Sequence, residues 1–263
     1  ENGEVVSNPD RLPESVDNFP RAPYELLDIE RFFQKNKGRQ ALQYSSSQGC
    51  PQKCTFCVEP KVFGGWSGRG AEKMVNEIEE LYRRYKVKHV SFADANFSVD
   101  VDRVEKMCHL LLERGIDITW TMTARSDQLV KIDPDMFPLM RAAGCNKVEI
   151  GVESGSASLL DFVKKNTTTE KAIASNKLLQ EAGIQGVYSF MVGFPKELPE
   201  SKNEIWQTLM LIKNLRRVHP EVMTVTFYVT PYPGTPIYDM ARTLDLKMPE
   251  KTEDWADWES TSV

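Results

Sequence analysis

The stretch LMRAAGCNKVEI, residues 139–150, decides the fold. Its helical run ends at Gly144, which takes the position just after a helix, where a left-handed backbone is needed. The β-rich strand Val148-Glu149-Ile150 follows. The same order of helix, break and strand recurs at 81–92, 111–120 and 178–190. The chain is therefore predicted to be built from repeating helix–strand units.

Strands that alternate with helices predict βαβ units and a parallel sheet. Two further strands are predicted at 40–45 and 222–229, which makes six. Six parallel strands with right-handed crossovers form either an open doubly wound sheet or a partial barrel.

The composition limits the classes of function. A chain of 263 residues forms one large barrel or two small domains. The net charge is −5 and no basic tract is present, so no nucleic-acid partner is expected. No apolar run approaches the roughly 18 residues of a membrane span, so no membrane partner is expected. Only five cysteines occur and three are crowded together, which favours a reducing cytoplasm over a disulfide framework.

Changes in composition predict three parts. The polar, proline-dotted start predicts a linker or N-terminal extension over residues 1–37, joined to an upstream domain. The repeating units occupy residues 38–240 and predict the core barrel. Residues 241–263 are acidic and lack an apolar repeat, which predicts the start of a C-terminal extension.

Cys50, Cys54 and Cys57 are crowded into the loop GCPQKCTFC, residues 49–57, directly after the first predicted strand. Three thiolates leave one coordination position open, whereas a closed structural zinc site takes four protein ligands. Cysteine thiolates commonly hold iron–sulfur clusters. The loop is interpreted as a cluster site with one open iron. A zinc site, which needs a fourth ligand such as His89 or His109, and three unrelated thiols are the alternatives.

Polar or glycine-rich residues follow the other predicted strands. They are Asp94 and Asn96 after the second, Arg125 after the third, Glu153 and Ser154 after the fourth, and Gly193 after the fifth. The carboxyl ends of parallel strands meet at one rim, which carries the active site in barrel enzymes. The cysteine loop and these residues are therefore predicted to converge. Cys108 and Cys145 are predicted to be core residues.

The spacing Cys50-x3-Cys54-x-Phe56-Cys57 resembles the motif of the radical S-adenosylmethionine (SAM) enzymes. The resemblance covers residues 38–240 and implies an α/β fold, a partial (βα)6 TIM-type barrel with parallel strands, preceded by the N-terminal linker segment. It also implies a 4Fe–4S cluster on the three cysteines, with SAM on the fourth iron. A donor such as flavodoxin or ferredoxin would supply the electron that cleaves SAM. The substrate would be a small molecule or a peptide.

The resemblance also assigns the polar groups of the methionyl part of SAM. The family's Gly-Gly-Glu segment is replaced here, so Asp94 or Asn96 would accept from the methionyl ammonium. Arg125 or Lys165 would pair with the methionyl carboxylate. Other roles remain open for these residues. Asp94 and Asn96 would be ordinary turn residues, and Arg125 would pair with Asp127. Lys165 would be a cation favoured by the dipole at a helix end.

For the nucleoside part, Glu153 matches a position that bonds the ribose hydroxyls, with Ser154 beside it. The backbone around Phe56 and the region of Gly193 would meet the adenine. An acid near a helix N-terminus is the alternative for Glu153.

Three features resemble the cobalamin-linked branch of the family. They are the proline-dotted, linker-like start of the chain, Phe97, and residues 230–235. This branch implies cobalamin held mainly by a domain outside this chain, with methyl transfer or oxidative cyclisation as the reaction. Two alternatives remain. One is a methylthiotransferase-like radical SAM enzyme, which normally carries additional upstream cysteines. The other is an iron–sulfur electron carrier without SAM cleavage.

Overall fold

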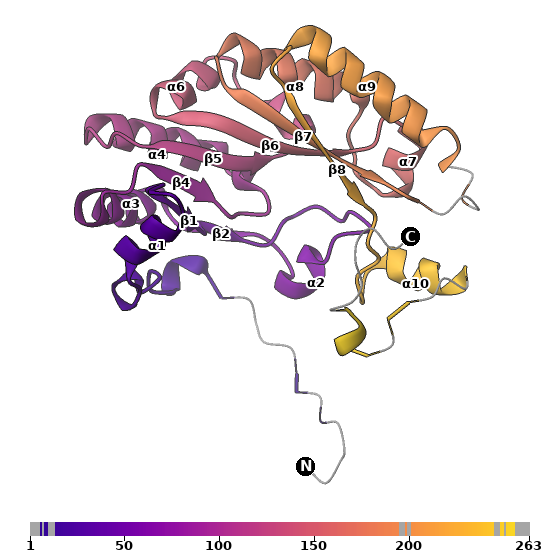
Figure 1. Ribbon diagram of the computed structural model, residues 1–263, viewed down its shortest axis with the longest axis horizontal. Coiled ribbons are helices and arrows are strands. Elements are labelled where there is room, and N and C mark those ends of the chain that lie inside the picture. The colour runs from indigo at the N-terminus through magenta and orange to yellow at the C-terminus, as the bar shows by residue number, and fades with distance from the viewer. Residues whose placement is uncertain are drawn as a thin grey trace.

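The computed structural model describes residues 6, 8–9, 14–194, 198, 201–244, 248–249 and 251–255. Within these residues, six parallel strands form one curved sheet in the order β1-β4-β5-β6-β7-β8 (Figure 1). The strands are β1 (Ala41–Tyr44), β4 (His89–Phe92), β5 (Thr119–Ala124), β6 (Cys145–Glu153), β7 (Gln185–Val192) and β8 (Met223–Tyr228). Because β1 and β8 are the two edges of this sheet, the barrel is partial. The predicted fold class is confirmed.

Helices cover the convex face of the sheet, and the cysteine loop crosses the concave side (Figure 1). The convex helices include α3 (Ala71–Tyr85), α4 (Val101–Glu113), α6 (Met136–Ala142), α8 (Thr169–Glu181) and α9 (Glu204–Val218). Shorter helices are α1 (Ile29–Lys35), α2 (Glu59–Phe63), α5 (Ser126–Leu129), α7 (Ala157–Phe162) and α10 (Pro236–Thr243). Helix α4 begins where the Asp100 carboxylate accepts from the backbone N–H of Arg103, which satisfies one free donor of the first turn.

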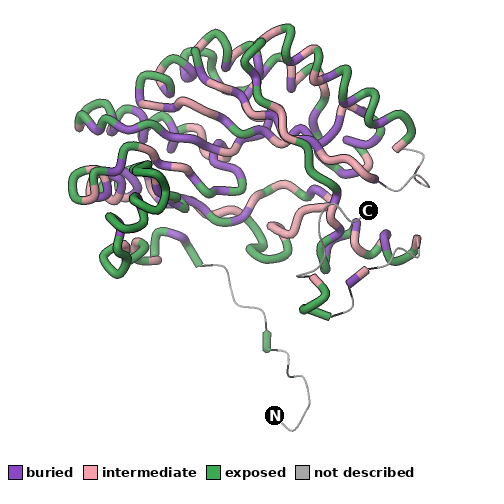
Figure 2. The backbone as a smooth tube through the Cα atoms, viewed as in Figure 1, coloured by how far each residue is buried: buried purple, intermediate pink, exposed green. Residues whose placement is uncertain are grey.

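The main hydrophobic core lies between the sheet and the convex helices. On β6, Val148, Ile150 and Val152 are buried, whereas Glu149 between them is exposed. Successive strand residues point to opposite faces, so each strand sends one set to the core and the other to the concave side. Figure 2 shows the buried backbone concentrated on the strands and on the helix sides that face them. Cys108 and Cys145 lie in this core, as predicted.

A second sheet holds the start of the cysteine loop. Its two strands, β2 (Ser47–Gln48) and β3 (Ser67–Gly68), pair antiparallel. The helix–strand repeat does not predict it, because two-residue strands carry no periodic signal. The range predicted as a linker includes α1, whose Ile29 and Phe33 are buried in the core.

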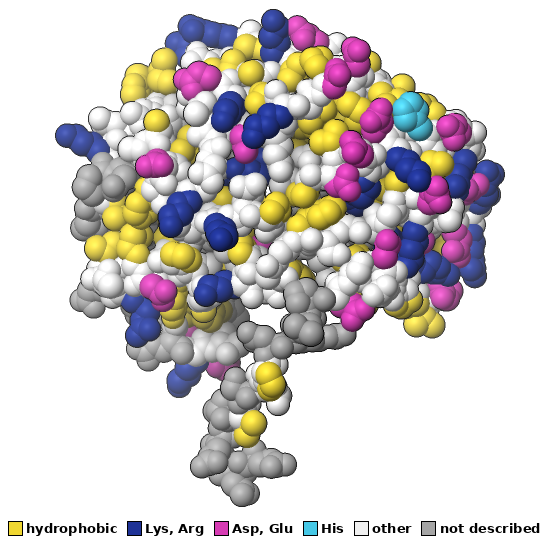
Figure 3. All heavy atoms as spheres, turned by 180° about the vertical axis from the view of Figure 1, so that it is seen from behind, with side chains coloured by type: hydrophobic (Ala, Val, Ile, Leu, Met, Phe, Trp, Pro, Cys, Tyr) yellow, Lys and Arg dark blue, Asp and Glu magenta, His cyan; other side chains and the backbone are white. Residues whose placement is uncertain are grey.

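The rear surface carries side chains of both charges interspersed with apolar ones (Figure 3). This mixture agrees with the modest net charge of −5. In the described ranges, no helix combines the length and the apolar character that a membrane span requires.

Candidate active site at the carboxyl rim of the barrel

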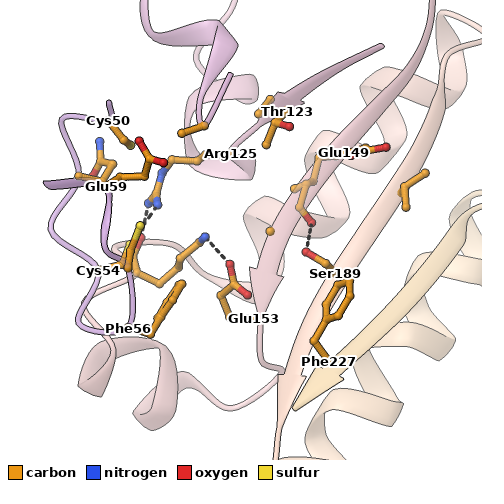
Figure 4. Close-up of a pocket in the computed structure, with 18 of the residues that line it drawn as sticks. Cys50, Cys54, Phe56, Glu59, Thr123, Arg125, Glu149, Glu153, Ser189 and Phe227 are labelled. Atoms are coloured by element: carbon orange, nitrogen blue, oxygen red, sulfur yellow. Dashed lines mark hydrogen bonds and ion pairs between the residues drawn. The ribbon is translucent and has the colours of Figure 1, made fainter. Parts of the chain in front are cut away.

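A cavity of about 470 Å³ lies between the cysteine loop and the concave side of β5 to β8 (Figure 4). All three clustered cysteines line it, together with four of the predicted cofactor-binding residues: Phe56, Arg125, Glu153 and Lys165. Asp94, Asn96, Ser154 and Gly193 are not among its lining residues. The rim therefore brings the cysteines together with one half of the predicted set.

Backbone hydrogen bonds to the ends of two helices hold the cysteine loop in place. The N–H of Thr55 donates to the carbonyl of Val163, just beyond α7, at 3.0 Å. The N–H of Ile237, at the start of α10, donates to the carbonyl of Thr55 at 3.2 Å. The Phe56 ring packs against the small apolar cluster that contains Val163 and Ile237. These contacts hold the loop although it has no regular secondary structure of its own.

A glycine is required at the entrance to this loop. Gly49 has φ +76°, and a Cβ atom there would lie 1.7 Å from the backbone oxygen of Gly65. Any side chain would therefore meet both an unfavourable backbone conformation and a backbone atom that cannot swing away.

Asp94 anchors the segment that leads into the loop. Its buried carboxylate accepts from the backbone N–H of Ser46 at 3.3 Å, from the Ser46 hydroxyl at 2.9 Å and from the Ser47 hydroxyl. The Arg103 guanidinium also donates to the Ser46 hydroxyl, at 3.0 Å. Burial raises the pKa of Asp94, against the opposing effect of the Ser47 and Ser46 hydrogen bonds. The polar atoms of this carboxylate are thus committed to the protein itself.

The Cys50 and Cys54 sulfurs each accept a hydrogen bond from a side chain of a different kind. The amide nitrogen Nδ2 of Asn96 lies 3.9 Å from Cys50 Sγ. The guanidinium nitrogen Nη1 of Arg125 lies 3.6 Å from Cys54 Sγ. Burial raises the pKa of the Cys57 thiol, and a hydrogen bond from the Glu59 backbone opposes that rise. All three thiols are free of disulfides.

Three cysteine thiols on one cavity are a donor set of the kind that holds iron–sulfur clusters. Among the described residues, no three cysteine, histidine, aspartate or glutamate side chains converge closely enough to hold one metal ion. The three thiols nevertheless surround one cavity. In a 4Fe–4S cluster each thiolate binds a different iron, so the sulfurs stand further apart than around one ion. Neither His89 nor His109, weighed for a zinc site, is among the residues that line the cavity.

Glu153 and Lys165 form a buried ion pair on the cavity wall. Lys165 Nζ lies 2.6 Å from Glu153 Oε1, and both side chains are about nine-tenths buried. Lys165 Nζ also lies 5.7 Å from the centre of the Phe56 ring. Glu153 has φ +75°, a strained conformation for a residue with a side chain, and such strain concentrates at functional sites.

The strain at Glu153 arises from an irregularity in β6. The fourth strand was predicted to end at Ile150, but β6 continues to Glu153, with a register shift against β7 between Gly151 and Glu153. A Cβ atom on Gly151 would lie 2.5 Å from Glu153 Oε1 and 3.1 Å from Lys165 Nζ. Gly151 therefore provides the space in which the ion pair lies.

Arg125 connects three segments at the end of β5. Its Nε donates to Asp127 at 3.0 Å, so the ion pair considered from the sequence is present. Its Nη1 reaches Cys54, as Figure 4 shows, and its Nη2 donates to the carbonyl of Lys165. The two remaining predicted residues, Ser154 and Gly193, are not among those that line the cavity. The Ser154 hydroxyl accepts from the N–H of Ser156 at 3.0 Å, and Gly193 lies against Tyr228.

Several lining residues were not singled out from the sequence. They are Glu59, Thr123, Glu149, Ser189 and Phe227. Glu149 carried a usable signal, because residues 149, 151 and 153 share one face of a strand. Glu59 carried no such signal, because its position in the cavity wall depends on the path of the cysteine loop. Burial raises the pKa of the Glu59 carboxyl.

A family model described as the radical SAM superfamily matches residues 44–212. An uncharacterized methyltransferase, PH0819, of Pyrococcus horikoshii is 30% identical over 92% of this chain and 50% of the relative. The anaerobic magnesium-protoporphyrin IX monomethyl ester cyclase of Rubrivivax gelatinosus is 27% identical over 90% of this chain and 41% of the relative. The chain thus spans half or less of the length of these relatives.

The fold is also shared with a solved structure. The apo form of the cobalamin-dependent S-adenosylmethionine radical enzyme OxsB superposes with a TM-score of 0.68 at 21% identity, over 94% of this chain and 41% of that chain. This likeness concerns the fold. Because the family match extends over more than half of its residues, the chain belongs to the radical SAM superfamily of enzymes.

Proposed function

We propose that Cys50, Cys54 and Cys57 hold a 4Fe–4S cluster and that SAM binds beside it in the same cavity. The observation that carries this proposal is the meeting of three free thiols and the buried Glu153–Lys165 pair on one cavity. When bound, the cluster and SAM together supply the radical chemistry of the family.

The side chains around the cavity suit the polar groups of SAM. The Lys165 ammonium is a cation available to the methionyl carboxylate. The Glu153 carboxylate, paired with Lys165, offers oxygen acceptors, which suit ribose hydroxyls. Phe56 and apolar strand residues such as Val187 and Val225 give the cavity apolar walls. For Asp94, Asn96, Ser154 and Gly193, a contact with SAM stays a prediction.

Anaerobic reconstitution tests the cluster. The chain is treated with iron and sulfide, and iron content, visible absorbance and electron paramagnetic resonance (EPR) are measured. We expect Cys54→Ala to lose the cluster and Cys108→Ala to keep it, because Cys108 is a core residue away from the cavity. A full iron content in Cys54→Ala would overturn the assignment.

Titration with SAM separates the proposed enzyme from an electron carrier. SAM should change the EPR signal of the reduced cluster, because it would bind the iron that lacks a cysteine. An unchanged signal would favour the carrier, in which the cluster only relays electrons.

We further propose that the full-length protein uses cobalamin and a reductant for methyl transfer or oxidative cyclisation of a small molecule. The names of the relatives support this step, since they include a methyltransferase and a cyclase, and OxsB is a cobalamin-dependent enzyme. The test is purification of the full-length protein with hydroxocobalamin. Bound corrinoid at about one per chain is expected, and its absence would refute the cobalamin proposal.

A further inference from the structure

We infer that Arg125 is a positioning residue that sets the reduction potential of the cluster through Cys54. This inference rests on the proposed function, because it assumes the cluster on the three cysteines. It also differs from the role taken from the family resemblance, in which Arg125 pairs with the methionyl carboxylate of SAM.

The three thiols face donors of different charge. Cys50 faces a neutral amide at 3.9 Å, and Cys57 faces a backbone N–H. Cys54 alone among the three faces a cation, at 3.6 Å in the described structure. Hydrogen bonds to charged groups are the stronger ones, so the contact at Cys54 is the strongest of the three.

The guanidinium is also held rigidly where it meets the sulfur. Arg125 is 5% exposed, and two of its nitrogens are fixed by Asp127 and by the carbonyl of Lys165. The Lys165 carbonyl belongs to the residue whose ammonium pairs with Glu153. Little water can therefore replace or screen the contact with Cys54.

The direction of the effect follows from charge. One-electron reduction adds a negative charge to the cluster and its thiolates and breaks no bond; the electron comes from the external donor. A nearby cation and a hydrogen bond to sulfur stabilise that added charge, so they raise the reduction potential. Removal of the guanidinium should make the cluster harder to reduce.

The experiment is a redox titration followed by EPR on the reconstituted full-length protein. We expect Arg125→Gln to reduce the equilibrium constant for one-electron reduction about tenfold, equivalent to a midpoint about 59 mV more negative. Arg125→Lys should restore most of the difference, because it keeps the charge. Asn96→Ser should shift the potential less, since it removes only a long bond to a neutral donor.

A double variant separates the effect on the reduction potential from misfolding. Arg125→Gln alone leaves the buried Asp127 carboxylate without its partner, whereas Arg125→Gln with Asp127→Asn removes both charges together. Normal iron content with an unchanged midpoint in this double variant would overturn the inference while leaving the proposed function intact. Failure of the wild-type protein to bind iron would overturn both.

Discussion

Gly151→Ala is predicted to weaken SAM binding while leaving the fold in place. A methyl group at this position would lie 2.5 Å from Glu153 Oε1. Ordinary contact begins at 3.4 Å, so the carboxylate must move by about 0.9 Å, which disturbs its 2.6 Å pair with Lys165. Both atoms are the far ends of flexible side chains, so they can move into the cavity without shifting the strand.

The size of the loss in SAM affinity follows from one lost hydrogen bond between SAM and the Glu153–Lys165 pair. A hydrogen bond to a charged group contributes about 1.5–3 kcal/mol, so SAM affinity should fall about tenfold to a hundredfold. The φ of Gly151 is not in the left-handed region, and alanine there gains about 0.4–1 kcal/mol through the unfolded state. This gain offsets part of the roughly 1–3 kcal/mol cost of overpacking, so net destabilisation should stay below about 3 kcal/mol.

The assay is calorimetric titration of the cluster-loaded protein with SAM, beside a urea unfolding curve. Gly65→Ala is the matched control, because its Cβ would meet nothing within 4 Å. An unchanged SAM affinity in both Gly151→Ala and Glu153→Gln would refute the assignment of this ion pair to SAM. A comparable loss in Gly65→Ala would show that the effect is not local.

Three further predictions concern the cysteine loop and its support. Gly49→Ala should destabilise the loop by about 2–4 kcal/mol through backbone strain and overlap, and iron content should fall; normal loading would contradict the geometry. Asp94→Ala should cost about 3 kcal/mol in urea unfolding, because it leaves the Ser46 and Ser47 hydroxyls without their acceptor and removes a negative charge that favours the buried Arg103 cation; a change below about 1 kcal/mol would contradict this role. In the cluster-free protein, iodoacetamide should label Cys57 well before Cys108, as peptide mass spectrometry would show. Burial raises the pKa of Cys108 to about 12, so about one thiol in 10⁴ is ionised at pH 8. Equal labelling rates would be evidence against a closed core around Cys108.

Local patterns in the sequence predict much of the fold. Helix and strand periods repeat over short windows, which is why six strands in a parallel sheet could be inferred, and the structure confirms them. The spacing of Cys50, Cys54 and Cys57 is equally local, because one loop carries all three. The end of β6 was predicted three residues early, since a register shift depends on the neighbouring strand and leaves no periodic signal.

The partners of the site residues were decided by tertiary structure. Arg125 meets Cys54, 71 residues away, and Asp94 meets Ser46, 48 residues away. Such pairs depend on strand register and on the path of the cysteine loop, which no short window contains. By itself the sequence determined the repeating units and placed three thiols on one loop. Only the folded sheet decided that a guanidinium faces one of those thiols and that a buried ion pair shares their cavity.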